Sequence, residues 1–137
     1  MAGSAVVDKF LKAIENAAID SCDAWGASAT LDATVPNWRM HVVGPDAIRA
    51  EYGRWFADPG RFEELHRYQV TGNGGVGDSN ATEVVEYTLS WSENGVPHAG
   101  HHLHVLTVAD DQIVNDTVFC GGRWPAALLA EMEAAHD

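Results

Sequence analysis

Four of the chain's seven histidines fall within residues 98–104, in the stretch HAGHHLH. An imidazole titrates near neutral pH, so it can donate or accept a proton, and it is also a common metal ligand. Side chains alternate between the two faces of a strand, so His102 and His104 share one face and His101 lies on the other. His102 and His104 are therefore candidate catalytic residues. The alternative is a strand whose histidines are merely hydrogen-bonded or partly exposed.

A metal site is the less favoured interpretation of this stretch. The pair His102-x-His104 could ligate a metal as it does in cupins, but that pattern also needs a glutamate a few residues downstream. The segment 105-VLTVA-109 contains none. We therefore expect no metal and no cofactor.

A carboxylate in the last predicted strand is the third catalytic candidate. Asp116 lies two residues from Val114 and two from Val118, with which it shares a strand face. A carboxylate among apolar neighbours either points outward or is a pocket acid with a raised pKa. In a pocket, Asp116 would transfer protons together with His102 or His104.

A second set of side chains is expected to bind the substrate. Five tryptophans occur in the 137 residues, and aromatic walls select flat, apolar or aromatic ligands. Arg39, the only basic residue of the first predicted hairpin, could pair with a ligand carboxylate or an internal acid, or could lie on the surface. Packing in the core is the alternative for the aromatic residues. The predicted substrate-binding residues are Asn37, Trp38, Arg39, Tyr87, Trp25, Trp55 and Phe119.

Charge and composition limit the class of partner. The chain is 46% hydrophobic and carries a net charge of −12, from 20 acidic and 8 basic residues. Nucleic acids and anionic membranes are bound chiefly through Lys and Arg, so neither is expected as a partner. Cys22 and Cys120 match no paired-cysteine motif, and the N-terminus does not have the pattern of a signal peptide. We expect one cytoplasmic domain, residues 1–137.

Periodicity and turn residues predict the elements that position these side chains. Helices are expected at 4–20, 23–29, 46–56 and 126–135, the last of them burying Leu128, Leu129 and Met132. Strands are expected at 30–35, 38–43, 62–71, 82–91, 99–108 and 113–120. Turns are expected at 93–95 and 109–112, and an irregular glycine-rich loop at 72–80. Gly121 and Gly122 should let the chain leave the sheet. Helices on one side of an antiparallel sheet make an α+β domain, with a pocket on the concave face of the sheet.

This order of elements, with 33-ATV-35, 44-GPDAI-48 and a DDQIV segment before the last strand, resembles the SnoaL-like branch of the nuclear transport factor 2 (NTF2)-like superfamily. The resemblance covers about residues 5–122. It implies a cone-shaped α+β barrel, in which a curved mixed or antiparallel sheet packs on N-terminal helices, plus a short C-terminal helix and commonly a homodimer. Ketosteroid isomerase, polyketide cyclases, limonene epoxide hydrolase and non-enzymatic binders share this fold, so the reaction stays open.

The residues depart from the mechanisms of those relatives. Asn37 occupies the position of the isomerase's general base, and an amide cannot accept a proton. The first predicted helix has no tyrosine to act as oxyanion donor, and the isomerase's second donor falls near His102. The catalytic aspartate of the cyclases falls around 120–121, four residues after Asp116.

The sequence predicts a cofactor-free acid–base enzyme of isomerase, cyclase, dehydratase or hydrolase type. Its substrate would be a small apolar or aromatic molecule bound in the pocket. The alternative is a non-catalytic binding protein with the same pocket, which the loss of the isomerase base at Asn37 favours. A homodimer through the sheet face is also expected.

Overall fold

The computed structural model of the chain describes residues 4–70 and 81–136. The predicted loop 72–80 lies outside the described residues. In chain order the elements are α1 (Ala5–Glu15), a short 3-10 helix η1 (Ile19–Ser21), β1 (Trp25–Val35), β2 (Trp38–Val43), α2 (Pro45–Trp55), β3 (Gly60–Val70), β4 (Ala81–Glu93), β5 (Val96–Ala109), β6 (Gln112–Pro125) and α3 (Ala126–Ala134).

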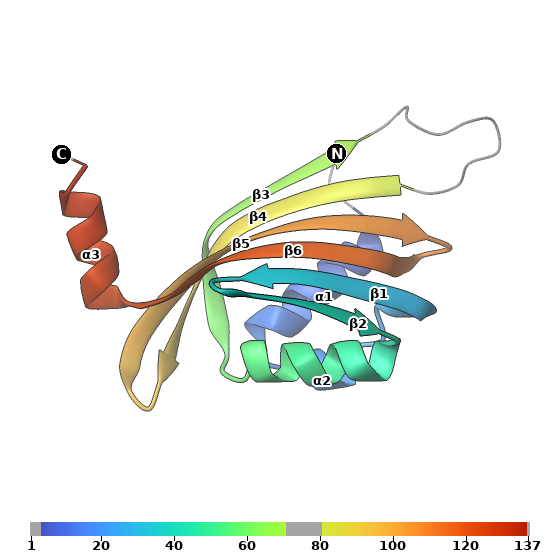
Figure 1. Cartoon of the computed structure of the whole chain (residues 1–137), viewed down its shortest axis with the longest axis horizontal. Coiled ribbons are helices and arrows are strands. Elements are labelled where there is room, and N and C mark those ends of the chain that lie inside the picture. The colour runs from blue at the N-terminus through green and yellow to red at the C-terminus, as the bar shows by residue number, and fades with distance from the viewer. Residues whose placement is uncertain (1–3, 71–80, 137) are drawn as a thin grey trace.

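The six strands form one curved sheet in the order β2-β1-β6-β5-β4-β3. Only β1 and β6 run parallel, and every other neighbouring pair is antiparallel. Helices α1 and α2 cover one face of the sheet, whereas α3 extends beyond its end (Figure 1). The predicted α+β class and mixed sheet are thus confirmed, although the sheet stays open, with β2 and β3 as its edges, and does not close into a barrel.

The core lies between the two helices and the inner face of the sheet. Helical spacing on α1 and alternation on the long strands direct apolar side chains into this layer. Burying one large apolar side chain stabilises the fold by about 1.5–3 kcal/mol. The core includes the fully buried residues Val7, Phe10, Ile14, Ile48, Tyr52, Val85, Tyr87, Leu106 and Val118.

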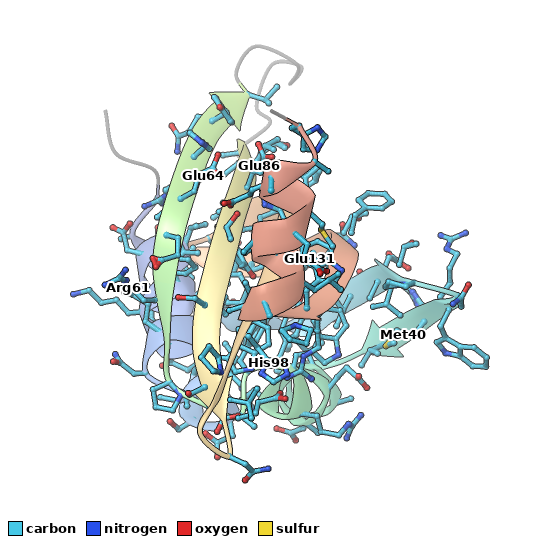
Figure 2. All side chains as sticks on the ribbon, turned by 90° about the vertical axis from the view of Figure 1, so that its left-hand side faces the viewer. Met40, Arg61, Glu64, Glu86, His98 and Glu131 are labelled. Atoms are coloured by element: carbon cyan, nitrogen blue, oxygen red, sulfur yellow. The ribbon has the colours of Figure 1, made fainter. Side chains whose placement is uncertain are left out.

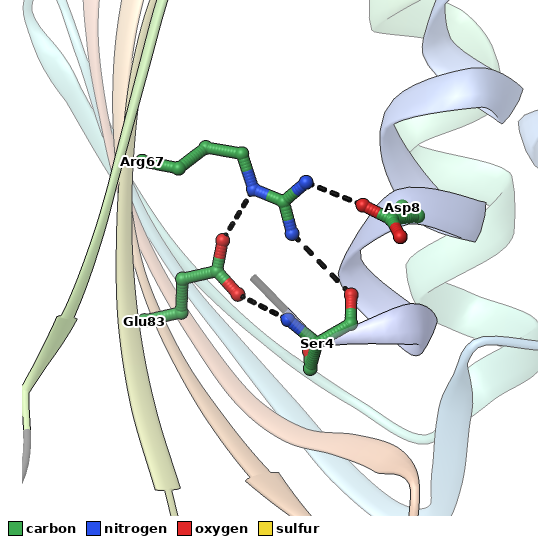
Figure 3. A network of polar contacts seen from close by, with 4 residues as sticks. All are labelled: Ser4, Asp8, Arg67 and Glu83. Atoms are coloured by element: carbon green, nitrogen blue, oxygen red, sulfur yellow. Dashed lines mark hydrogen bonds and ion pairs between the residues drawn. The ribbon is translucent and has the colours of Figure 1, made fainter. Parts of the chain in front are cut away.

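A polar cluster fixes the start of α1 on the sheet (Figure 3). The buried Glu83 carboxylate accepts hydrogen bonds from the Arg67 Nε (2.5 Å) and from the backbone N–H of Ser4 (3.0 Å). Arg67 also donates to Asp8 and to the Ser4 carbonyl oxygen. Ser4 is the residue before the helix, as predicted, but its side chain makes no capping hydrogen bond. Glu83 thus accepts from the Ser4 N–H in the way that the third residue of a helix does in a capping box.

Two predicted helices in the first third of the chain are wrong in extent or type. The first helix ends at Glu15 because the chain turns at Ala17, which has a φ of 53°. Residues 25–29 are the start of β1 and not part of a helix. Trp25 pairs with Ile113 of β6, and local periodicity carries no information about a partner so distant in sequence.

The C-terminal predictions also need correction. No residue of α3 is buried: Leu128 is exposed, and Leu129 and Met132 are only partly covered. Viewed from that end, α3 crosses in front of the strands (Figure 2), and its Leu129 lines a groove together with residues of β3 and β4. The chain does not leave the sheet at Gly121, because β6 stays paired with β5 as far as Pro125.

Candidate active site

A pocket of about 430 Å³ opens between the C-terminal end of α2, the end of β1 and the strands β4, β5 and β6. This volume lies in the range of small-molecule sites, and most of the lining is apolar. Its lining residues are Val35, Pro36, Glu51, Arg54, Trp55, Phe56, Leu89, Trp91, His102, Cys120, Gly122 and Arg123.

His102 is the buried titratable group of this lining, with an exposed fraction of 4%. Its ring stacks on Trp55 (centroids 5.9 Å apart) and contacts the edge of Phe56 (5.8 Å). Burial, with smaller contributions from His104, His101 and Arg123, lowers the pKa of His102 from 6.5 to about 3. The imidazole is therefore neutral at physiological pH. Its Nδ1 is a buried atom without a hydrogen-bond partner among the described residues, so one polar group of the ring is left unsatisfied beside the pocket.

An irregularity in the pairing of β5 with β6 lies directly beside His102. Gly100 pairs with Arg123 and His102 pairs with Cys120, so two residues of β6, Gly121 and Gly122, face one residue of β5. Gly122 has a φ of 124°, a conformation that residues with a Cβ rarely adopt. Such a bulge bends a strand and redirects the side chains next to it. The glycine pair therefore shapes the pocket wall.

Glu51 is a site residue that the sequence analysis missed. It lies on α2, where residues three and four positions apart are neighbours. Its carboxylate accepts a hydrogen bond from the Trp55 Nε1 (2.9 Å) and another from Arg54. Trp55 in turn stacks on His102, so one indole contacts both the carboxylate and the imidazole. Glu51, Arg54 and Trp55 are three and four residues apart on a predicted helix, and this spacing is the sequence pattern that could have placed Glu51 at the site.

Arg123 of β6 and Trp91 of β4, the two strands on either side of β5, form the rim of the pocket. The guanidinium carbon of Arg123 lies 5.0 Å from the centroid of the Trp91 ring, and Arg123 also donates a hydrogen bond to Glu93. About half of the Arg123 side chain is exposed. Stacking on the indole and pairing with Glu93 hold this cation at the pocket entrance.

Behind the pocket lies a fully buried chain of hydrogen bonds. The Tyr52 hydroxyl donates to Asp116 Oδ2 (2.5 Å), the His104 Nδ1 lies 3.0 Å from Asp116 Oδ1, and the Tyr87 hydroxyl lies 2.9 Å from the His104 Nε2. Burial and the Asp116 charge raise the pKa of both tyrosines, which keeps them protonated. With the His104 proton on Nδ1, every donor of the chain points toward the Asp116 carboxylate.

The structure separates the predicted catalytic residues. His102 lines the pocket, whereas His104 and Asp116 have no exposed surface and are not part of the lining. The two imidazoles still share one strand face, with ring centroids 6.2 Å apart. Phe10 packs edge-on against His104, at a centroid distance of 5.4 Å. His104 and Asp116 therefore lie where they can support the pocket wall. Of the two predicted pairs, the His104–Asp116 contact is present (3.0 Å) but lies outside the pocket lining, and among the described residues no hydrogen bond joins Asp116 to His102.

Of the predicted substrate-binding residues, Trp55 lies in the lining. Tyr87 is fully buried behind the pocket, bonded to His104, and Trp25 is buried against Phe10. The other predicted residues are exposed outside the lining: Asn37, Trp38, Arg39 and Phe119.

The exposed positions have local causes. Asn37 follows Pro36 in the tight turn between β1 and β2 and has a φ of 68°, which is the pattern of a type II turn. Trp38 and Arg39 come directly after this turn, on the edge strand β2. Phe119 points to the outer face because its neighbours Val118 and Cys120 point inward.

The remaining titratable chemistry is limited. Burial raises the pKa of the Cys120 thiol at the pocket wall, which disfavours the thiolate needed for nucleophilic attack. Within residues 4–70 and 81–136, no group of three or more His, Cys, Asp or Glu side chains is arranged to hold a metal ion.

In the same part of the chain, no helix is both long and apolar enough to cross a membrane.

Comparison with solved structures identifies the class of fold. A proposed isomerase from Bacillus subtilis aligns with a TM-score of 0.62 at 14% identity, covering 85% of this chain and 84% of that one. An NTF2-like protein of unknown function from Mesorhizobium loti aligns with a TM-score of 0.61 at 16% identity, covering 85% and 88%. A hypothetical protein with a ketosteroid isomerase-like fold from Catenulispora acidiphila, solved in complex with trimethylamine, aligns with a TM-score of 0.58 at 14% identity, covering 88% of each chain.

These alignments establish that the chain has the NTF2-like fold, as the sequence resemblance implied. No protein-family model and no curated protein sequence matches the chain. Because these solved structures are less than 20% identical to the chain, they establish its fold but not its activity.

Proposed function

We propose that the protein is a cofactor-independent acid–base enzyme of the isomerase type, acting on a small, largely apolar cyclic ketone or enone in this pocket. One observation carries the proposal: a carboxylate, Glu51, and a buried neutral imidazole, His102, border the same pocket and are linked by Trp55. Two structural neighbours that are proposed isomerases are consistent with this class of reaction.

In the proposed reaction the Glu51 carboxylate accepts a proton from a carbon next to the substrate carbonyl. The electron pair of the broken C–H bond forms a C=C bond to the carbonyl carbon, and the carbonyl π pair moves to the oxygen, which gives an enolate. Neutral His102 donates a hydrogen bond to that oxygen, the role for which an imidazole of low pKa is suited. With a β,γ-enone, the oxygen electron pair then re-forms the C=O bond and Glu51 returns the proton to the γ carbon, which moves the double bond next to the carbonyl. Trp55 and Phe56 exclude water from the reacting atoms.

The proposal is tested by hydrogen exchange in D₂O. Flat ketones and enones are incubated with the protein, and the NMR signal of the hydrogens next to the carbonyl is followed. We expect the protein to accelerate exchange of at least one compound and Glu51→Gln to slow it by about 10²–10⁴-fold, since loss of a general base has that effect. The matched control is Glu86→Gln, a carboxylate of β4 outside the lining that pairs with His101. Equal exchange by wild type and Glu51→Gln would contradict the mechanism.

A non-catalytic binding protein is the second candidate. Both oxygens of the Glu51 carboxylate already accept a hydrogen bond, one from Arg54 and one from Trp55, so neither is free of a partner when a substrate arrives. A compound that binds in the pocket without any accelerated exchange would favour this candidate over the enzyme.

We also propose a homodimer through the outer face of the sheet, the face opposite α1 and α2. Leu103 and Val105 of β5 are only partly covered there, and Phe119 of β6 is 49% exposed. Such a patch on a long sheet is typical of an association surface. Sedimentation equilibrium should show a dimer that Phe119→Glu dissociates, and a wild-type monomer at all concentrations would contradict the proposal.

A further inference from the structure

The charge of the pocket lining differs in sign from the charge of the chain. The chain carries −12, yet two of its eight basic residues, Arg54 and Arg123, line this one pocket. Glu51, the one acidic residue among the described residues of the lining, pairs with Arg54. His102 is neutral, so Arg123 leaves the lining with a net positive charge. Glu93, outside the lining, pairs with Arg123 through one terminal nitrogen, so the other N–H groups of the guanidinium are the positively charged donors left at the entrance among the described residues.

The position of Arg123 suits it to bind a carboxylate on a ligand. A guanidinium presents five N–H donors in a planar fork that matches the two oxygens of a carboxylate. The hydrogen bond to Glu93 uses Nη2, and Glu93 itself is not part of the pocket lining. Because the guanidinium is stacked over Trp91 and half exposed, it is both oriented and accessible at the rim.

The walls below this cation are suited to a flat ring. Trp91 lies under the guanidinium, and Trp55 and Phe56 pack around His102 deeper in the pocket. A planar molecule that reaches from Arg123 to His102 would have its charged end in contact with solvent and its ring against the indoles. An aromatic ring between such walls gains contact area and stacking energy.

We propose that the ligand of this pocket is a flat cyclic carboxylic acid whose carboxylate binds Arg123 at the rim. This inference rests on the proposed function, because it names the class of molecule that would present its carbonyl to His102. It also moves the carboxylate-binding role from Arg39, which lies outside the pocket, to Arg123.

The test compares three probes of one shape by isothermal titration calorimetry: 2-naphthoate, its neutral amide 2-naphthamide and the cation 2-naphthylmethylammonium. We expect 2-naphthoate to bind at least about tenfold more tightly than the amide, with the ammonium compound weakest. Arg123→Gln should remove the preference of acid over amide. Arg39→Gln, an exposed arginine outside the lining, is the matched control and should keep it.

Equal binding of acid and amide, tightest binding of the ammonium compound, loss of the preference in Arg39→Gln, or no binding of any probe would each overturn the inference. Its failure is distinguishable from failure of the proposed function. If acid and amide bind alike while neutral ketones still exchange hydrogen, only the ligand class is wrong. If the acid is preferred but no compound exchanges hydrogen, the ligand class stands and the catalytic proposal fails.

Discussion

The buried position of His102 predicts a specific dependence of stability on pH. The pKa is about 3 in the folded protein and 6.5 without burial, so below pH 6.5 the unfolded chain binds a proton that the folded chain does not. The free energy of unfolding therefore falls as the pH drops from about 6.5 toward 3, and this contribution is fully retained above that window. Between pH 7 and pH 5 this single group should lower the free energy of unfolding by about 2 kcal/mol.

The variant His102→Asn removes the titrating ring and keeps a polar side chain. Urea unfolding, followed by tryptophan fluorescence, gives the free energy of unfolding of both proteins at pH 7 and pH 5. The variant should lose about 2 kcal/mol less than wild type over this interval, whatever its absolute stability. His66→Asn, which removes an exposed histidine of β3, should keep the wild-type pH dependence. Identical losses in wild type and His102→Asn would refute the argument that burial keeps this imidazole neutral.

Three further changes test the structure around the site. Tyr52→Phe removes a buried hydrogen bond to the Asp116 carboxylate, which should cost about 1.5–3 kcal/mol and lower the melting temperature by about 5–10 °C. Tyr68→Phe, at a half-exposed tyrosine, is the control and should have little effect. Equal shifts in the two variants would contradict the buried network. Glu83→Gln weakens the anchor of α1 and should cost about 1.5–3 kcal/mol in urea unfolding; an unchanged midpoint would argue against that anchor. Gly100→Ala would place a Cβ 2.9 Å from a backbone carbonyl oxygen beside the bulge, so calorimetry should show a loss of about 1–3 kcal/mol, and a neutral result would mean that the bulge is not constrained.

The sequence was sufficient for features with a local physical cause. The two hairpin turns were predicted correctly because Asn, Asp and Gly tolerate positive φ, and Asn94, Gly95, Asp110 and Asp111 all have φ between 51° and 79°. Alternation placed His102 and His104 on one strand face, which the structure confirms.

Features that depend on residues distant in the sequence could not be predicted from local sequence patterns. Residues 25–29 form a strand because β6 lies beside them, and no periodicity within the segment records that neighbour. Similarly, the apolar residues of the C-terminal helix predicted a buried face. Whether a helix face is covered depends on where the preceding strand positions the helix, and α3 lies beyond the end of the sheet (Figure 1).

The same limit explains the candidate site. Alternation placed two histidines on one strand face, but the packing of Phe10 and Tyr52 around His104 decides that, of the two, His102 reaches the pocket. Glu51 and Arg123 are charged residues of a kind that usually lies on a solvated surface. They become site residues because α2 and the bulge of β6 bring them to one opening, which requires the tertiary structure.

The most direct test of the proposed site is a crystal structure of the protein with a compound that it exchanges in D₂O. The compound should lie in the pocket, with its carbonyl oxygen within hydrogen-bonding distance of the His102 ring and the exchanging carbon next to the Glu51 carboxylate. A bound compound whose carbonyl contacts neither residue, or that lies outside the pocket between α2 and β4–β6, would contradict the account.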